Sequence, residues 1–335
     1  MDSVLQTRRL LDDFSVSEFG RFRFTPTLLE SHYHFELAVP IDFRAREVGS
    51  TALKRFKEIL HLEAVDHPGK YVSIALANLD HDINPADWLA IELAEQQAHV
   101  TQRSESLGPE GVICDCLVAF ADGTQGQIRT VKDGKRLFLV GAMAAKNAWE
   151  DFKQHAAVSL ASFILLHPQV AACAEPLTTA YVDPGNQISF QYPASWKEKR
   201  YEESSETVIC LTHSHSGVIV GELTAHYAAA SSLTTPHKLA QFHSLRLRSR
   251  GFKVAGAPLL TLPEIEFEEG YLYEPSVSLD STRFVCPCII FRVQNSLVLF
   301  GLVGPTQGDS PEWWAINKRA LEIAYRSIRI GSERS

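Results

Sequence analysis

The sequence has no apolar run long enough to cross a membrane. Its longest apolar stretches, such as SLVLFGLVG at 296–304, have the length of a β-strand, whereas a spanning helix needs about 20 apolar residues. The first residues, MDSVLQTRRLLDDF, include no apolar run of the length that a signal peptide needs. These absences predict a cytoplasmic protein that does not insert into a membrane.

Cysteine and basic charge are also scarce. Six cysteines in 335 residues are too few for a disulfide scaffold. The net charge of −8 at pH 7 argues against nucleic acid as a partner, because phosphate binding needs a concentrated basic surface. One basic cluster, LRLRSRGFK at 245–253, is typical of a solvated helix end, where cations suit the helix dipole.

Local signatures of catalysis are missing as well. The sequence contains no G-x-S-x-G elbow, no P-loop and no H-E-x-x-H helix. We therefore assign no catalytic, cofactor-binding or metal-binding residue from the sequence, and we expect no cofactor.

What the sequence does contain is an internal duplication. NPADWLAIELAEQQAH at 84–99 and TPHKLAQFHSLRLRSRG at 235–251 both read as helices that begin with a capping residue and a proline. In the second helix, Leu239, Phe242 and Leu245 are the expected apolar face. FELAVPIDF at 35–43 matches ISFQYPASW at 188–196, and RLFLVGAMA at 136–144 matches SLVLFGLVG, which aligns Gly141 with Gly301.

Each half reads as strand, hairpin, helix, three strands and a closing helix led by tryptophan, Trp149 in the first half and Trp314 in the second. Helices that follow runs of antiparallel strands are typical of an α+β layer. We predict a first domain at 1–168 with an N-terminal extension, a linker at 169–187 and a second domain at 188–335. Extra helices are expected at 4–14 and 50–60.

A family resemblance follows from these stretches. ISFQYPASWKEKRYEESSETVICL resembles the start of PsbP-like and DcrB-like domains, in which an aromatic-rich strand ends in Pro-x-x-Trp before a hairpin and a capped helix. The resemblance covers most of 185–332 and, more weakly, 30–166. It implies two tandem α/β/α sandwich domains, each a mainly antiparallel sheet packed with helices. Relatives of this fold are mostly binding modules, including EagR-type chaperones of type VI secretion.

Two cysteine pairs remain to be explained, Cys114 with Cys116 and Cys286 with Cys288. In a strand, residues i and i+2 share a face, so each pair points one way. Zinc sites usually use Cys-x₂₋₄-Cys spacing with two further ligands, which neither pair provides. The alignment of the halves also puts the pairs on different strands. We predict reduced, structural cysteines without a bound metal.

The surface candidates are aromatic. Trp313 precedes the tryptophan expected in the core, and Phe267, Tyr271 and Tyr273 lie in the acidic stretch LPEIEFEEGYLYEP at 262–275. That stretch reads as a loop and an edge strand, or as a rim that binds a partner, because aromatic residues are enriched at interfaces.

Three hypotheses of function follow. The first is a non-enzymatic protein-binding module, such as a bacterial secretion-system adaptor, chaperone or immunity-type partner that binds an effector protein or its apolar helix. The second is a hydrolase-type enzyme with a site between the domains. The third, from fold analogy, is a GTPase-binding regulator.

Overall fold

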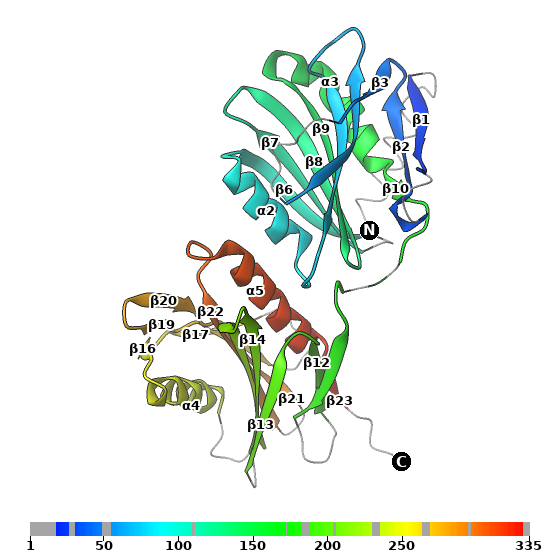
Figure 1. Cartoon of the computed structure of the whole chain (residues 1–335). Helices are drawn as coiled ribbons and strands as arrows, with labels where there is room; N and C mark the ends of the chain where they lie inside the picture. Colours follow the sequence, from blue (N-terminus) through cyan, green and yellow to red (C-terminus); the bar gives the residue numbers. More distant parts are fainter. Residues whose placement is uncertain are drawn as a thin grey trace. The chain divides into compact units, whose positions relative to one another are not determined.

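The computed structural model describes residues 18–26, 31–48, 55–108, 111–169, 171, 173–182, 188–203, 206–229, 235–262, 269–293 and 296–330. The chain divides into two compact units, Met1–Ala174 and Glu175–Ser335 (Figure 1). In the described part of each unit, antiparallel strands form one small and one large open sheet, and two α-helices accompany them. This architecture confirms the predicted α+β class.

The large sheet of the first unit has the strand order β3-β4-β5-β9-β8-β7-β6. The strands are β3 (Phe43–Arg46), β4 (Lys57–Ala64), β5 (Tyr71–Asn78), β6 (His99–Gly108), β7 (Gly111–Ala119), β8 (Thr124–Asp133) and β9 (Arg136–Ala145). The small sheet joins β1 (Phe19–Phe24), β2 (Phe35–Pro40) and β10 (Ile164–Leu165), with the 3-10 helix η1 (Ser31–Tyr33) before β2.

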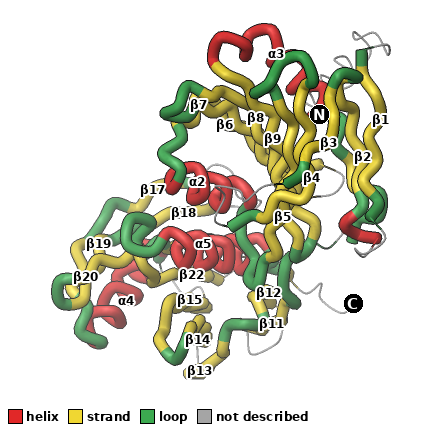
Figure 2. The backbone as a smooth tube through the Cα atoms, turned by 45° about the horizontal axis from the view of Figure 1, so that its top comes forward, coloured by secondary structure: helices red, strands yellow, loops and turns green. Residues whose placement is uncertain are grey.

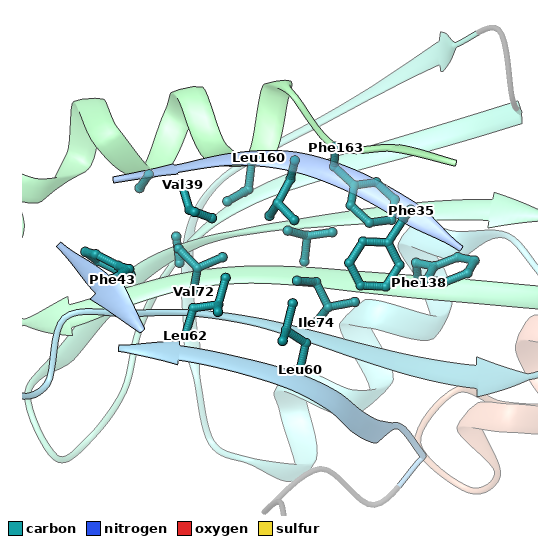
Figure 3. Close-up of a cluster of buried hydrophobic side chains, with 14 of the residues drawn as sticks. Phe35, Val39, Phe43, Leu60, Leu62, Val72, Ile74, Phe138, Leu160 and Phe163 are labelled. Atoms are coloured by element: carbon teal, nitrogen blue, oxygen red, sulfur yellow. The ribbon is translucent and has the colours of Figure 1, made fainter. Parts of the chain in front are cut away.

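Helices cover both faces of this sheet. Helix α2 (Pro85–Glu95) packs on β6, β7 and β8, and helix α3 (Lys146–Ala161) packs on β8, β9 and β2 (Figure 2). A buried apolar cluster fills the layer beneath α3, where Phe35 of β2 meets Phe138 of β9 (Figure 3). Because side chains alternate along a strand, Leu137 and Leu139 of β9 are buried on the opposite face.

The large sheet of the second unit has the order β13-β14-β15-β22 and then continues as two short ladders, β20-β19-β16 and β21-β18-β17. Its strands are β13 (Lys197–Glu203), β14 (Glu206–His215), β15 (Val218–Ala229), β16 (Lys253–Ala255), β17 (Leu259–Thr261), β18 (Gly270–Tyr273), β19 (Ser276–Leu279), β20 (Thr282–Val285), β21 (Cys288–Val293) and β22 (Ser296–Pro305). The small sheet joins β11 (Leu177–Tyr181), β12 (Ile188–Pro193) and β23 (Arg329–Ile330).

Two separate cores lie on the two faces of this second sheet. Phe291 and Phe300 pack with Leu321 of helix α5 (Pro311–Arg326) on one face. Ile290 and Leu299 pack with Leu247 of helix α4 (Pro236–Ser249) on the other. The second unit is therefore a helix–sheet–helix sandwich. None of the helices within the described ranges combines the length and apolarity that crossing a bilayer requires.

Both units have small-sheet strands, a hairpin, a helix, further strands and a closing helix, which is the predicted succession. Within the described residues, however, four strands (β6–β9) separate the two helices of the first unit and seven (β16–β22) separate those of the second, where three were predicted in each. Asn84 caps α2 by accepting a hydrogen bond from the Ala86 amide at 2.8 Å, and Thr235 caps α4 by accepting one from the Lys238 amide at 3.2 Å. Gly111 and Gly270 begin β7 and β18, which occupy corresponding positions in the two sheets. The two cysteine pairs therefore lie on different strands of the repeat.

Some local predictions were wrong. Residues 57–60 belong to strand β4 and not to a helix, because they pair with β5 across a register shift between Glu58 and Leu60. Strand β18 is not an edge strand, since it pairs with both β17 and β21. Residues 55 and 56 are not helical either, whereas residues 50–54 and the helix expected at 4–14 lie outside the described residues.

The segment predicted as a linker, 169–187, contains strand β11, which pairs with β12, and the division between the units falls inside it. Trp314 is only partly buried, with Lys318 Nζ 5.2 Å from its ring centroid, so the core of α5 is built by smaller residues such as Ala315 and Ile316. Trp149 is buried, as expected.

Candidate functional site

Helix α4 buries a face that its apolar pattern does not predict. Leu239 is buried, but Phe242 is 45% exposed and Leu245 is 58% exposed. His243 and Ser244 point into the protein in their place. Successive helical residues lie about 100° apart, so this choice of rotation puts two large apolar side chains in solvent and two polar ones inside.

The exposed side of α4 lies between two grooves. One groove has a volume of about 320 Å³ and is lined by His237, Ala240, Gln241, Ser244, Leu245, Arg248, Gly256, Ala257 and Tyr273. The other has a volume of about 230 Å³ and is lined by Tyr201, Glu206, Val208, Phe242 and Arg246. Leu245 borders the first groove and Phe242 borders the second. We call this region, from Tyr201 across α4 to Ala257, the α4 surface.

Arginine side chains flank the two exposed apolar residues. Arg246 packs its guanidinium 5.5 Å from the Tyr201 ring centroid and places Nη2 2.8 Å from Cys210 Sγ. Arg248 donates to the Val254 carbonyl at 3.0 Å. The partners in these contacts are neutral groups, so neither contact pairs an arginine with an opposite charge.

The buried side of α4 meets the second cysteine pair. His243, Cys286 and Cys288 are 2%, 3% and 0% exposed, and their ligand atoms all lie within 4.8 Å of one another. Cys286 Sγ is 3.8 Å from His243 Nε2. The cysteines share one face of the strand region, as predicted. The spacing of the two cysteines in the sequence does not reveal that the fold brings His243 next to them.

Backbone features on the sheet make room for this cluster. Pro287 has no N–H and separates β20 from β21, which leaves Cys286 outside the ladder. Gly301 of β22 lies directly opposite Cys288. A Cβ at Gly301 would come within 2.7 Å of the His243 ring and 3.3 Å of Cys288 Sγ, so a larger residue would push the imidazole away.

The two thiols have different acidities. The hydrogen bond from Cys288, with a smaller contribution from His243, lowers the pKa of the Cys286 thiol to about 6, although burial opposes that change. Burial raises the pKa of the Cys288 thiol well above its usual value. The cluster therefore favours one thiolate beside one neutral thiol.

Elsewhere, the buried Cys114 and Cys116 have their sulfurs 3.9 Å apart.

The residues predicted to bind a partner are placed as follows. Tyr273 is 7% exposed, shares a hydrogen bond with Ser244 Oγ at 2.9 Å and borders the larger groove. Tyr271 is partly buried, and its hydroxyl donates to Glu269 at 3.4 Å. Trp313 is partly buried against the rings of His213 and His215, at centroid distances of 5.4 and 4.8 Å. Phe267 lies outside the described residues.

Only Tyr273 among these belongs to the α4 surface. Sequence reasoning missed the outward orientation of Phe242 and Leu245 and the inward orientation of His243. One signal was present: Leu239, His243 and Leu247 follow one another at intervals of four and make a helical stripe of their own. A helical face defined by apolar residues alone does not include the histidine.

Comparisons with known proteins give no family assignment. No family model matches the chain, and no curated protein matches it. Among solved structures, cyanobacterial PsbP from Synechocystis sp. PCC 6803 has 15% identity and a TM-score of 0.35, covering 46% of this chain and 92% of its own. The T6SS immunity protein TplEi from Pseudomonas aeruginosa has 14% identity and a TM-score of 0.25, covering 95% and 100%.

A third structure, the Tle4–Tli4 complex, has 12% identity and a TM-score of 0.24, and the match covers 95% of this chain and 100% of the other. All three TM-scores are below 0.5. These matches by themselves therefore identify neither a family nor a function for this chain.

Proposed function

We propose that this chain is a protein-binding module and that it binds its partner through the α4 surface. The observation that supports this most directly is the rotation of α4. Burial of a side chain such as Phe242 or Leu245 contributes roughly 1.5–3 kcal/mol to stability. Because both side chains are exposed, the fold lacks part of that contribution for each of them. A partner that covers both residues would recover that free energy.

The composition of the α4 surface resembles that of protein interfaces. Aromatic residues and arginine are enriched at such interfaces, and Tyr201, Phe242 and Arg246 line one groove together. Each groove has the size of one or a few side chains. We expect the partner to place apolar side chains in the two grooves and carboxylates near Arg246 and Arg248.

Within this role, we propose a secreted effector protein as the partner, with the chain acting as an adaptor, a chaperone or an immunity-type protein. The support for this finer proposal is the sequence resemblance of 185–332 to PsbP-like and DcrB-like domains. Neither alternative, a hydrolase or a GTPase-binding regulator, gains an observation of its own from the described residues.

The test replaces the exposed pair with the double variant Phe242→Ser/Leu245→Ser. The matched control is Val218→Ser/Ile219→Ser, which removes two apolar side chains that are 65% and 61% exposed at the β14–β15 hairpin. The wild-type chain is first used as bait to isolate a partner from a lysate of the cells in which this protein occurs. Its affinity for all three purified chains is then measured by calorimetry.

We expect the α4 variant to bind about 30-fold more weakly or worse, which corresponds to about 2 kcal/mol, the size of an interface hot spot. The hairpin variant should keep the wild-type affinity. Equal affinity of all three chains would contradict the α4 surface as the binding site. Concentration-dependent self-association that is lost only in the α4 variant would identify the partner as a second copy of this chain.

A further inference from the structure

The buried cluster of His243, Cys286 and Cys288 has the side chains of a metal centre. Within the described ranges, it is the one group of at least three His, Cys, Asp or Glu side chains whose ligand atoms lie within 4.8 Å of one another. His243 comes from α4, while both cysteines flank the break between β20 and β21. The histidine precedes Cys286 by 43 residues, which is why sequence spacing did not reveal it.

The donor set favours a soft metal ion with low coordination number. Thiolate ligands select Cu(I), zinc and iron–sulfur clusters, and imidazole suits copper and zinc. Structural zinc is almost always held by four ligands in a tetrahedron, and catalytic zinc keeps a water as its fourth ligand. Here the cluster offers three donors, all in residues that are at most 3% exposed. This arrangement suits a metal ion that is stable with three ligands.

The spacing of the donor atoms agrees with a three-coordinate ion. With a metal–sulfur bond of about 2.3 Å and a metal–nitrogen bond of about 2.0 Å, two ligands at a trigonal angle lie roughly 3.8 Å apart. Cys286 Sγ and His243 Nε2 are 3.8 Å apart. The third donor, Cys288 Sγ, lies within 4.8 Å of both.

The residues around the cluster hold its side chains in place and lie beside a groove. Gly301 leaves the space that the imidazole occupies, and Pro287 holds the backbone between the two cysteines. The larger groove beside α4 is lined by Ser244, which follows His243, and by Tyr273, which pairs with Cys288 across β18 and β21. That groove is therefore bordered by neighbours of two of the three proposed ligands.

We propose that His243 Nε2, Cys286 Sγ and Cys288 Sγ bind one Cu(I) ion between α4 and β21. Each thiol that becomes a ligand releases its proton to solvent, so the ion replaces protons and no electron is transferred. The bound ion joins the helix to the strand and fixes the rotation of α4. This proposal stands independently of partner binding, because its test reads metal occupancy.

The test titrates the full-length, fully reduced chain with Cu(I) under anaerobic conditions in competition with bicinchoninate. We expect one equivalent of Cu(I) per chain to be withheld from the chelator. Cys288→Ser and His243→Asn should each weaken Cu(I) binding by more than the roughly 10–100-fold that loss of an outer-shell partner costs. The control Cys114→Ser/Cys116→Ser removes the other buried pair, which no third ligand residue joins in the part of the chain that the structure describes. It should bind Cu(I) as the wild type does.

A second measurement does not depend on the folding of any variant. X-ray absorption of the loaded wild-type chain should show Cu(I) with three ligands, two sulfurs and one nitrogen. Alkylation followed by peptide mass spectrometry should show that Cu(I) protects Cys286 and Cys288 more than Cys114 and Cys116. Protection of the first-unit pair alone, unchanged Cu(I) affinity in Cys288→Ser, or tighter stoichiometric binding of Zn(II) than of Cu(I) would overturn the proposal.

Discussion

At the residue scale, the buried side chain of His226 predicts a response of this protein to acid. It is 3% exposed, its Nε2 is 3.2 Å from Glu206, and its ring lies 5.1 Å from that of Phe242. Burial lowers the pKa of His226, and the carboxylate of Glu206 only partly opposes that change. Two titratable side chains of α4 beside it, those of His243 and Arg246, lower the pKa of His226 further.

This depressed pKa predicts a loss of stability in mild acid. The unfolded chain takes up a proton on His226 near its ordinary pKa of about 6.5, while the folded chain resists protonation until the pH is lower. The free energy of unfolding should therefore fall as the pH drops below about 6.5, by up to roughly 1.4 kcal/mol per pH unit for this group.

Urea unfolding at pH 7.5 and 5.5 measures the effect, with His226→Gln as the comparison. We expect the variant to lose less stability than the wild type between the two pH values. An identical loss in both proteins would assign the acid sensitivity to other groups.

At the scale of the element, the contact of α4 with β22 depends on the absence of one side chain. Gly301 allows the His243 ring to lie against the strand, since a Cβ there would be 2.7 Å from two ring atoms. Gly301→Ala should cost about 1–3 kcal/mol, as overpacking of a core does, and should displace His243 from the cysteines.

The control for this substitution is Gly256→Ala, because a Cβ at Gly256 would meet nothing within 4 Å. Denaturant unfolding should leave Gly256→Ala within about 0.5 kcal/mol of the wild type, as at most surface sites. If Gly301→Ala were as stable as the wild type, helix α4 would be able to move away from β22 without a loss of stability.

The element scale also shows where prediction from sequence failed. The ends of α2 and α4 were predictable because caps and prolines act within one turn. The rotation of α4 was not predictable, because it depends on which side chains of β21 and β22 fill the space beneath it. The sequence predicts a helix over residues 57–60, because their pairing with β5 is a contact between separate strands, which local rules do not include.

At the scale of the whole molecule, each of the three apolar clusters described above is built from residues of one unit. The cluster beneath α3 draws its residues from 22–165, and the two clusters around the second large sheet draw theirs from 180–328. Both sheets of the second unit are also built only from its own strands.

We therefore expect residues 175–335 alone to fold cooperatively, because the fragment contains every group of both of its cores. Circular dichroism should show a single thermal transition, and an amide NMR spectrum should be well dispersed. A fragment that stays unfolded, while the full chain unfolds cooperatively, would show that the two units depend on each other for stability and would contradict their role as independent domains.

The sequence by itself determined the features that arise from short-range rules. Helix caps, alternating strands and the internal repeat are all visible in the order of residues, and they sufficed for the α+β class and for the placement of the two cysteine pairs on different strands. Only the tertiary structure decided that Phe242 and Leu245 face solvent and that His243 meets Cys286 and Cys288. The physical reason is that a helix can present several faces to a sheet, and the packing of distant strands selects one of them.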